Sequence, residues 1–310
     1  MRAGEERIPS LDAGLKSFKL CPLPGLSTDT RRASLVTQFV DSIRRIEYVH
    51  RLRTTTIDPD RCDPTNDLFD PIRAAVLKHK DGNLDEAFWL VFLATHCGRH
   101  LDDHWRLART LYGSNGTGPC WNWSTISGTP DGFHDWLVNA YTSLRSDGVL
   151  RRFGNHRKYE TLLPGSARGT SAVFRSYIAW VGANRGHGLL IQEAQDACGG
   201  DPRATFDYLY NSMGAVTSFG RTGRFDFLTM VGKVGLANIE PGIPYLVGAT
   251  GPLRGARLAF GGSYDANLTA QKLDRWVTRL GDHLGLGMQA MEDALCNWQK
   301  SPDKYLPFRG

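Results

Sequence analysis

The sequence predicts an all-α fold, on two observations. Apolar residues recur through most of the 310 residues at the three- and four-residue spacing of amphipathic helices. The strict alternation of apolar and polar residues that marks half-buried strands is scarce. We therefore expect packed helices, arranged as two lobes around a cleft.

The N-terminal elements follow from local composition. Residues 1–28 carry Pro and Gly with little periodicity, so we expect an extended arm there. A long amphipathic helix should fill 29–53, because its apolar residues fall on one face: Leu35, Val36, Phe39, Val40, Ile43 and Ile46. A polar loop then leads to a shorter helix at about 70–79.

The stretch NLDEAFWLVFLATHCGRHLDDHWRLARTLYGS predicts two helices with a break near Gly98. The first is apolar on nearly every side, which is typical of a helix in the middle of a domain. Surface loops are expected at 115–130 and 148–170, which are rich in small polar residues. Further helices are expected at 131–146, 171–181, 188–197, 202–217, 221–233, 252–259, 268–283 and 286–298.

We find no convincing linker after residue 28. Residues 29–310 should therefore form one helical domain, with possible lobes 29–200 and 201–310.

Composition excludes several classes of protein. With 41% hydrophobic and 22% charged residues the chain has ordinary globular composition, and no apolar run could cross a bilayer. The start MRAGEERIPSLDAG lacks the pattern of a signal peptide, so we expect a cytoplasmic protein. Its six cysteines include no C-x-x-C pair, which argues against zinc ribbons and disulfide frameworks and predicts free thiols.

Arginine is locally dense although the net charge is only +5. Six arginines lie in 31–53, and RRFGNHRKY places four cations within eight residues. Such clusters suit phosphate contacts on nucleic acid. A solvated helix face is an equally good interpretation of the cluster in 31–53.

The stretch SFGRTGR, residues 218–224, predicts a tight turn between two helices. Thr222 could cap the second helix, whose first amides would then face outward and bind an anion. Gly220 and Gly223 would let a phosphate approach the backbone, with Arg221 and Arg224 beside it. A simple turn between two core helices would have the same spacing.

Two further segments carry groups suited to DNA. FGNHRKYE is too polar for a core segment and fits a loop that clamps phosphates or contacts a bulky base, through Asn155, His156, Arg157, Lys158 and Tyr159. TGPLRGAR could present Arg254, Arg257 and backbone amides to a second phosphate, although it could equally be an ordinary helix start.

His96, His100 and His104 recur every four residues beside Asp103, and two histidines four residues apart on a helix can bind zinc. No Glu adjoins His96 as it would in a metalloprotease helix, and His104 lies a full turn beyond the first pair. We therefore expect neither a metal nor a cofactor.

Several phrases together resemble a known family. FGNHRKYE, FDFLTMVGKVGLANIEPG, TGPLRGARLAFGG and MQAMEDALCNWQKSPDKYLPFRG are similar to the α-glutamyl/putrescinyl thymine pyrophosphorylase family, clade 3. That family is associated with hypermodified bases of phage DNA. The resemblance implies membership of the helix-hairpin-helix DNA glycosylase superfamily, of which that family is a branch and in which an acid follows the hairpin by about twenty residues. The resemblance covers roughly 83–310.

The resemblance implies candidate catalytic acids. Glu240 lies twenty residues beyond Gly220, where the superfamily usually has Asp, and Ser218 occupies a hairpin position that is commonly Gly. Asp226, one turn into the hairpin helix, Asp274 in KLDRWVTRL and Asp293 in MEDALCNWQK remain alternatives.

The resemblance also implies groups that handle an extruded base. His96, Arg99 or His100 would fill the gap in the stack, and Trp298, with Asn297 and Gln299, would contact the base. Core packing of Trp298 is an equally good interpretation.

The expected function is a metal-independent DNA glycosylase that binds double-stranded DNA. It would excise a bulky modified pyrimidine, such as glucosylated hydroxymethylcytosine or hypermodified thymine, and leave an abasic site, in anti-phage defence. One alternative is a transferase that modifies pyrophosphorylated hydroxymethyluracil. Another is a DNA-binding protein without chemistry.

Overall fold

The computed structural model describes residues 4–155, 160–182 and 184–308, and it confirms the all-α class. Fourteen α-helices occur in the described residues, beside one antiparallel pair of two-residue strands, β1 (Gly154–Asn155) and β2 (Glu160–Thr161). The chain divides into two compact units, 1–51 with 240–309, and 52–239. The expected lobe boundary near residue 200 therefore falls inside the second unit.

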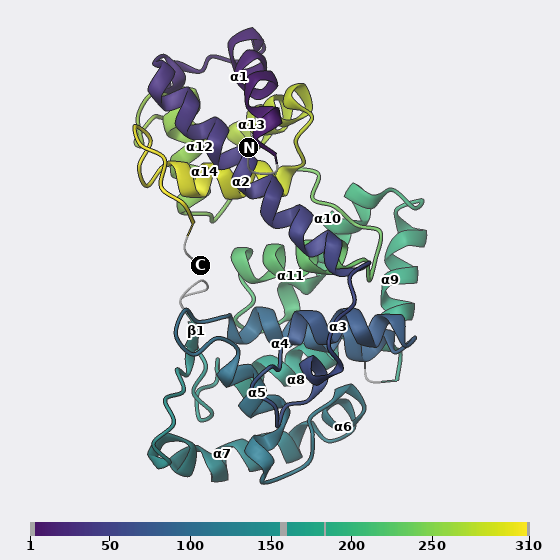
Figure 1. Ribbon diagram of the computed structural model, residues 1–310. Coiled ribbons are helices and arrows are strands. Elements are labelled where there is room, and N and C mark those ends of the chain that lie inside the picture. The colour runs from purple at the N-terminus through teal and green to yellow at the C-terminus, as the bar shows by residue number, and fades with distance from the viewer. Residues whose placement is uncertain (1–3, 156–159, 183, 309–310) are drawn as a thin grey trace. The chain divides into compact units, whose positions relative to one another are not determined.

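The first unit joins the two ends of the chain (Figure 1). Its helices are α1 (Ile8–Ser17), α2 (Asp29–Leu52), α12 (Gly251–Gly261), α13 (Ala270–Leu284) and α14 (Met288–Trp298). Helix α12 packs closely on α14, since a Cβ on Gly255 would lie 2.3 Å from the carbonyl oxygen of Leu295. Side chains of all five helices share one apolar core.

The expectation of an extended arm at 1–28 is wrong for its described part. Ile8–Ser17 is the helix α1, and short 3₁₀ turns occur at Glu5–Arg7 and Pro24–Leu26. Leu11, Leu15 and Phe18 are buried in the core of the first unit. The arm folds because its few apolar side chains are spaced to meet α2 and α13, a fit that composition alone does not reveal.

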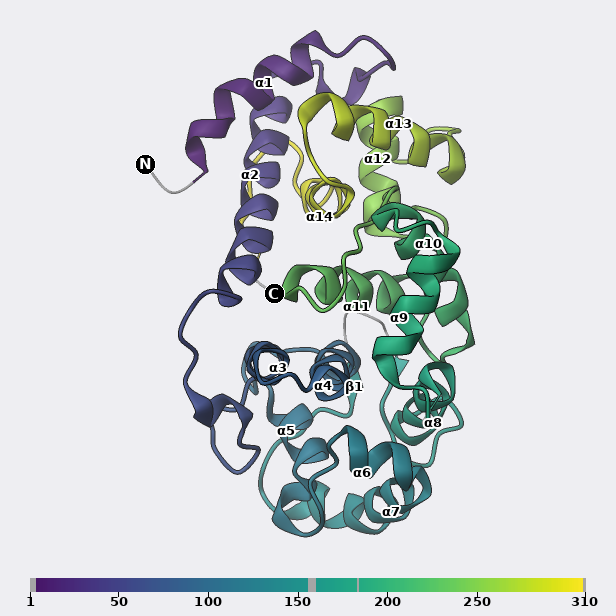
Figure 2. The ribbon, with the colours of Figure 1, turned by 90° about the vertical axis from the view of Figure 1, so that its right-hand side faces the viewer.

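The second unit is built around α4 (Leu84–Cys97), whose residues 86–94 are all buried. Figure 2 views α4 end-on beside α3 (Pro71–Lys80), with α11 (Arg221–Val234) on one side of the pair. The remaining helices are α5 (Arg106–Tyr112), α6 (Trp123–Gly128), α7 (Pro130–Ser146), α8 (Thr170–Val181), α9 (Gly186–Ala197) and α10 (Pro202–Ser212). The central, all-round apolar helix predicted from the sequence is confirmed.

The predicted boundaries are mostly close to those observed, with two differences. The supposed loop 115–130 contains α6, and the helix expected at 202–217 ends at Ser212 before a 3₁₀ turn, Met213–Ala215. The first difference is a short helix within a segment rich in small polar residues, and the second is a helix end that lies a few residues earlier than expected. All six cysteines are free thiols, as predicted.

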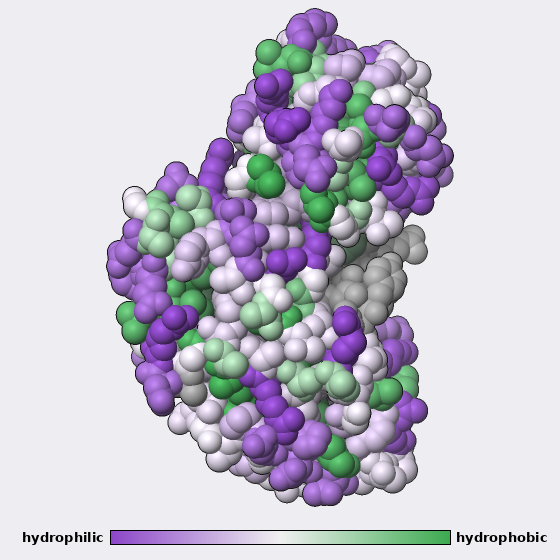
Figure 3. Space-filling view, turned by 180° about the vertical axis from the view of Figure 1, so that it is seen from behind, coloured by the Kyte–Doolittle hydropathy of each residue, from purple (hydrophilic) through white to green (hydrophobic). Residues whose placement is uncertain are grey.

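Large exposed hydrophobic side chains are scattered over the surface. On the face that Figure 3 shows, green hydrophobic residues are interspersed among purple hydrophilic ones. Among the most exposed are Leu20, Leu101, Val247 and Leu150. Single apolar side chains of this kind do not mark an interface. No helix in the described residues is long and apolar enough to cross a membrane.

The burial of Asp274 yields a stability prediction. Its side chain is 6% exposed, and its Oδ1 accepts a hydrogen bond of 2.8 Å from the amide of Leu246. Asp274→Ala should leave that amide unsatisfied and lower the free energy of unfolding by about 1–3 kcal/mol. Urea denaturation measures this loss. The matched control Asp265→Ala, exposed in the same unit, should change it by less than about 0.5 kcal/mol.

Candidate functional site

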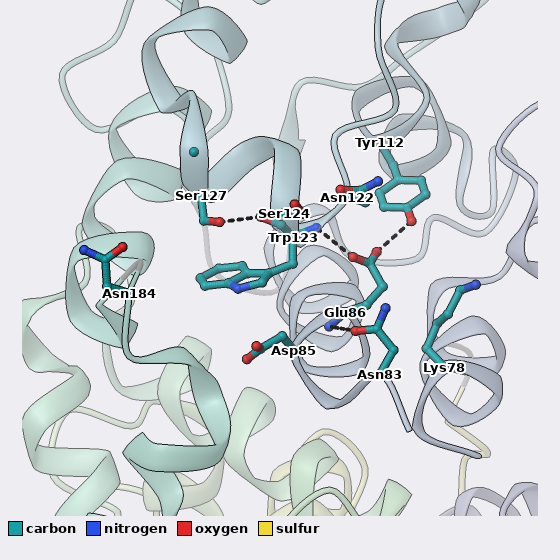
Figure 4. A pocket seen from close by; sticks show the side chains of 11 residues that line it. Lys78, Asn83, Asp85, Glu86, Tyr112, Asn122, Trp123, Ser124, Ser127 and Asn184 are labelled. Atoms are coloured by element: carbon teal, nitrogen blue, oxygen red, sulfur yellow. Dashed lines mark hydrogen bonds between the residues drawn. The ribbon is translucent and has the colours of Figure 1, made fainter. Parts of the chain in front are cut away.

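A polar pocket of about 760 Å³ opens at the N-terminal end of α4 (Figure 4). It lies wholly within the second unit, between the ends of α3, α4, α5, α6 and the segment before α9. Its size is that of a typical site for a small molecule or a single nucleotide. The lining residues are Lys78, Asn83, Asp85, Glu86, Tyr112, Asn122, Trp123, Ser124, Ser127, Gly128 and Asn184.

The start of α4 places two carboxylates side by side in this pocket. Asn83 is the N-cap, and its side-chain oxygen accepts a hydrogen bond of 3.2 Å from the amide of Glu86. Asp85 and Glu86 therefore occupy the first turn, where the positive end of the helix dipole favours negative charge.

Glu86 is a buried carboxylate, only 4% exposed. Its two oxygens accept hydrogen bonds of 2.6 Å each, from the Tyr112 hydroxyl and from the backbone amide of Trp123. Burial nevertheless raises the pKa of Glu86, because desolvation outweighs these two bonds. Burial likewise raises the pKa of Tyr112, so that its hydroxyl stays protonated and donates.

Asp85 is in a different environment, with its side chain 41% exposed. Its Oδ1 accepts two hydrogen bonds from His187, one of 2.6 Å from the backbone amide and one of 2.7 Å from Nδ1. The hydrogen bond from the His187 ring lowers the pKa of Asp85, in spite of partial burial. Asp85 is therefore an anion at neutral pH.

Trp123 contacts the surroundings of both acidic groups. Its amide binds Glu86, and its ring contacts the His187 ring edge-on at 4.5 Å between centroids. Figure 4 shows the indole between Ser127 and Asp85, with Asn122 and Asn83 on the side of Glu86. The pocket thus combines an aromatic surface, amide and hydroxyl groups, and neighbouring carboxylates whose pKa values shift in opposite directions. Such a pair is suited to acid–base chemistry or to stabilising a developing positive charge.

The predicted hairpin lies near the other end of α4. Phe219 is buried in the turn and stacks on Phe92 of α4 at 4.7 Å. Asp85 and His96 are eleven residues apart on this helix, roughly 16 Å along its axis. The turn and the pocket therefore occupy different ends of one rigid element.

Local geometry of the turn corrects three details of the prediction. Helix α11 begins at Arg221 with Gly220 as N-cap and no side-chain cap, so Thr222 does not cap it. Gly220 has φ −67° and open space at its Cβ position, whereas Ser218 has the left-handed φ of 57°. Arg224 lies over the Tyr210 ring and donates to its carbonyl, so it points back onto α10.

Part of the turn keeps the exposure that phosphate binding requires, but Gly223 does not, which corrects the expectation that a phosphate approaches the backbone there. Gly220 is exposed, Arg221 and Thr222 are half-buried, and Gly223 is buried inside α11. The Arg221 guanidinium lies over the Phe225 ring at 4.6 Å. Binding of a phosphate here remains a prediction.

The three residues expected to enter the DNA stack, His96, Arg99 and His100, differ in their exposure to solvent. His96 is fully buried, hydrogen-bonded to Thr170, and cannot fill a gap in DNA. Arg99 and His100 lie beyond the end of α4 at the surface, where His100 and His104 pair through their backbones. The three histidines of the suggested metal site therefore do not share a helical face.

Asn155 is also buried, and its Nδ2 donates to the carbonyl oxygens of Thr95 and His96. It satisfies the C-terminal end of α4, which corrects the expectation that it contacts DNA. The rest of that candidate segment lies outside the described residues: His156, Arg157, Lys158 and Tyr159.

The candidate acids from the sequence differ in access to solvent. Glu240 is exposed and belongs to the first unit, whereas Asp226 is half-buried in α11. Asp293 forms an ion pair of 2.6 Å with Arg45, which links α14 to α2. The buried Asp274 holds the amide of Leu246, so its carboxylate cannot reach a deoxyribose.

The proposed base-contacting residues of α14 are structural. Trp298 is fully buried in the core of the first unit, so it cannot stack on an extruded base. Asn297 is also buried and donates to the carbonyl of Asp293, and Gln299 donates to the carbonyl of Cys296. The interpretation of Trp298 as a core residue is the correct one.

Both arginines of the second predicted phosphate site lie in α12. Arg254 is exposed, with its guanidinium 4.9 Å from the centre of the Tyr264 ring. Arg257 is half-buried and donates to the carbonyl of Leu268. Arg254 alone therefore keeps the access to solvent that a phosphate contact needs.

The sequence alone does not reveal the pocket. Asp85 and Glu86 lie in the stretch NLDEAF, which has the pattern of a capped helix start, and acids in a first turn are common there. Their special environment comes from Tyr112, Trp123 and His187, which are distant in the sequence. No local signal marks such a contact.

Gly186 lies directly against the Asp85 carboxylate and leaves room for it by having no side chain. Its φ is +72°, and a Cβ there would lie 3.0 Å from Oδ2 and 3.2 Å from Oδ1 of Asp85. Gly186→Ala should displace the carboxylate and lower the free energy of unfolding by about 1–2 kcal/mol, because a side chain disfavours the left-handed backbone. Urea denaturation tests this. Gly188→Ala, two residues on in α9 with only an ordinary contact to Leu84, should be neutral or stabilising.

The sequence matches a known protein family. Residues 30–310 match alpha-glutamyl/putrescinyl thymine pyrophosphorylase clade 3. No curated protein and no solved structure gives a significant match. Because the match spans nearly the whole chain, the protein belongs to the clade 3 family of alpha-glutamyl/putrescinyl thymine pyrophosphorylases, whose description points to enzymes of DNA base modification.

Proposed function

We propose that this protein is a DNA glycosylase that excises a bulky modified pyrimidine and that the pocket at the start of α4 is its active site. The observation that carries the proposal is the pair Asp85 and Glu86, adjacent in one pocket with pKa values shifted in opposite directions. The family description supports a modified thymine or a related pyrimidine as the target.

The chemistry needs an anion of this kind. When the bond between C1′ of the deoxyribose and the base nitrogen breaks, its electron pair leaves with the base and positive charge develops on the sugar. Asp85, ionised and partly exposed, would stabilise that charge and accept a proton from the attacking water. The departing base takes up a proton from solvent, so the products are a free base and an abasic site.

The other lining groups would position the base. Asn122, Ser124 and Asn184 offer hydrogen-bonding groups, and Trp123, only 6% exposed, would contribute the edge of its ring to the pocket wall. A pocket of about 760 Å³ is ample for a pyrimidine with a large substituent. The nucleotide must leave the helical stack to enter it.

The turn at 218–224 would bind the duplex backbone at a place separate from the pocket where the reaction occurs. Its helix, α11, has fourteen residues, an exposed Gly220 at the N-cap and no side-chain cap. The roughly 16 Å of α4 between pocket and turn is less than the approximately 34 Å of one duplex turn, so one site could engage both. This would be backbone binding without sequence readout.

Transfer of an amine or amino acid onto a pyrophosphorylated base is the second candidate, because the family description names pyrophosphorylases. A pyrophosphate leaving group carries several negative charges. Among the described lining residues, Lys78 is the single cation against two carboxylates. This charge balance favours glycosidic cleavage, in which positive charge develops, over release of pyrophosphate in this pocket.

The biological setting that we propose is anti-phage defence. A protein that removes hypermodified thymine or glucosylated hydroxymethylcytosine would damage phage DNA and leave unmodified host DNA intact. The positive groups that would serve nonspecific DNA binding include the exposed Arg254 and the half-buried Arg221, although the net charge is only +5.

The activity is tested with the purified protein and phage-modified or unmodified DNA. We expect strand breaks after alkali, and a released base detected by mass spectrometry, only with modified DNA. Asp85→Asn should lower the rate on the order of 10²-fold or more. The control Asp135→Asn, an exposed acid of α7 in the same unit, should leave it unchanged.

Other outcomes of this assay have distinct meanings. Loss of activity in Glu240→Gln but not in Asp85→Asn would place the reaction at the acid that the resemblance indicates and refute the pocket assignment. A mass increase of the DNA on adding an amine, with no abasic site, would show transfer. Binding without either product would leave a DNA-binding protein without chemistry.

The role of the turn is tested separately by binding. Arg221→Ala should weaken affinity for duplex DNA of any sequence and reduce the slope of log affinity against log salt by about 0.9, the loss of one phosphate contact. Fluorescence anisotropy at several salt concentrations measures both. Arg145→Ala, an exposed arginine of α7, is the matched control. An unchanged slope in Arg221→Ala would exclude the turn as a phosphate site.

A further inference from the structure

His187, which binds Asp85 through Nδ1, makes another hydrogen bond through Nε2, to Tyr177. The proposed reaction does not itself use this bond. The Tyr177 hydroxyl is 2.7 Å from Nε2 of His187, and Nδ1 of His187 is 2.7 Å from Oδ1 of Asp85. Tyr177 in α8 and His187 in α9 are both fully buried. The three groups form a chain from the core to the pocket, with Asp85 at its open end.

The order of donors in this chain follows from burial. Desolvation raises the pKa of Tyr177 well above its usual value, so the hydroxyl keeps its proton. Desolvation also lowers the pKa of His187, more than its bond to Asp85 raises it, so the imidazole is neutral. A neutral imidazole has one N–H. Because Tyr177 donates to Nε2, that N–H lies on Nδ1 and donates to Asp85.

Packing fixes the imidazole in this orientation. Its ring stacks on Phe88 at 4.8 Å with 16° between planes, and it meets Trp123 nearly edge-on. The backbone amide of His187 binds the same Asp85 oxygen at 2.6 Å. Two donors from one residue therefore hold Oδ1, and a ring rotation would break a bond at each nitrogen.

We propose that His187, fixed by Tyr177, is a positioning residue that occupies Oδ1 of Asp85 and orients the carboxylate so that Oδ2 faces the pocket. The role of Asp85 in catalysis rests on the proposed function, but the positioning does not. Gly186 contributes by leaving the space next to both oxygens free of a side chain. A carboxylate held in this way needs no reorganisation when charge develops on a substrate.

The titratable groups that face this site come from five helices. Glu86 adjoins Asp85 on α4, Lys78 and Tyr112 line the same pocket from α3 and α5, and His187 and Tyr177 approach from α9 and α8. The hydrogen bond from His187 is the largest cause of the lowered pKa of Asp85. Its removal should therefore raise that pKa, whereas loss of Lys78 should have a smaller effect.

The test compares two variants that both lack the imidazole. His187→Asn keeps a neutral amide N–H that can donate to Asp85, whereas His187→Phe keeps the flat ring and its stacking on Phe88 but has no donor. The protein is labelled with ¹³C at aspartate carboxyl groups, and Asp85→Asn identifies the signal of Asp85. Titration then gives the pH at which Asp85 protonates in each variant, without DNA or activity.

We expect the Asp85 titration to move to higher pH in His187→Phe and to stay near that of the unsubstituted protein in His187→Asn. Tyr177→Phe should give a smaller upward shift, because Nε2 loses its partner while Nδ1 can still donate. Equal titrations in His187→Asn and His187→Phe would overturn the proposal. This outcome is distinct from absence of glycosylase activity, which would refute the proposed function alone.

The pH dependence of the free energy of unfolding provides a second measurement, independent of the ¹³C NMR titration. A carboxyl group with a lowered pKa in the folded state stabilises the protein above its unfolded pKa, about 3.9, and this contribution is lost as pH falls through the folded pKa. His187→Asn should therefore have a higher urea midpoint than His187→Phe near pH 7, and the difference should shrink towards pH 3. In an Asp85→Asn background the difference should lose its pH dependence. A difference that is constant with pH would contradict the positioning role.

Discussion

The hydrogen bond between His187 and Asp85 sets the character of the pocket, because it lowers the pKa of one of two adjacent carboxylates while burial raises the pKa of the other. Asp85 and Glu86 are neighbours in sequence and share the first turn of α4. Without outside contacts both would have similar pKa values. His187 stabilises the anion of Asp85, while burial beside Tyr112 and Trp123 destabilises the anion of Glu86. The chemical difference therefore comes from α5, α6 and α9, which pack around the end of α4.

Helix α4 makes this possible because it is immobilised along its length. An apolar helix that is covered on all sides has its axial rotation fixed by many side-chain contacts. Phe92 alone stacks on Tyr177 at 3.6 Å and on Phe219 at 4.7 Å. The rings of α8 and of the turn before α11 thus hold the helix whose N-terminal end carries the acids. A substitution in this aromatic core should therefore change the position of the two acids in the pocket.

The sequence predicted the fold class and the family well, because both depend on patterns spread over many residues. Apolar periodicity located nearly every helix, including the central one. It failed for Ile8–Ser17, where two buried leucines in a short helix give too little signal against the surrounding Pro and Gly. Likewise α6 has only six residues, below the length at which periodicity can be recognised.

The candidate site was predicted much less well, because residue type does not reveal burial. His96, Asn155 and Trp298 have side chains that DNA-binding proteins use, yet each satisfies or fills the interior here. Asp85 and Glu86, by contrast, line the pocket but were not predicted as site residues, because acidic residues are common in the first turn of any helix. Contacts from residues as far away as His187 distinguish them, and a single sequence carries no record of such contacts.

Asp85 and Glu86 differ in their exposure to solvent, which indicates different roles for the two acids. Glu86 has both oxygens engaged by strong donors and almost no contact with solvent, so its replacement would leave Tyr112 and the Trp123 amide without partners. It is therefore suited to shaping the pocket wall. Asp85 has one oxygen fixed and the side chain open to the pocket, so it can meet a substrate without losing its support. A carboxylate held by one oxygen and offered by the other stays charged and aligned while the substrate changes, which is the condition for stabilising a short-lived cation.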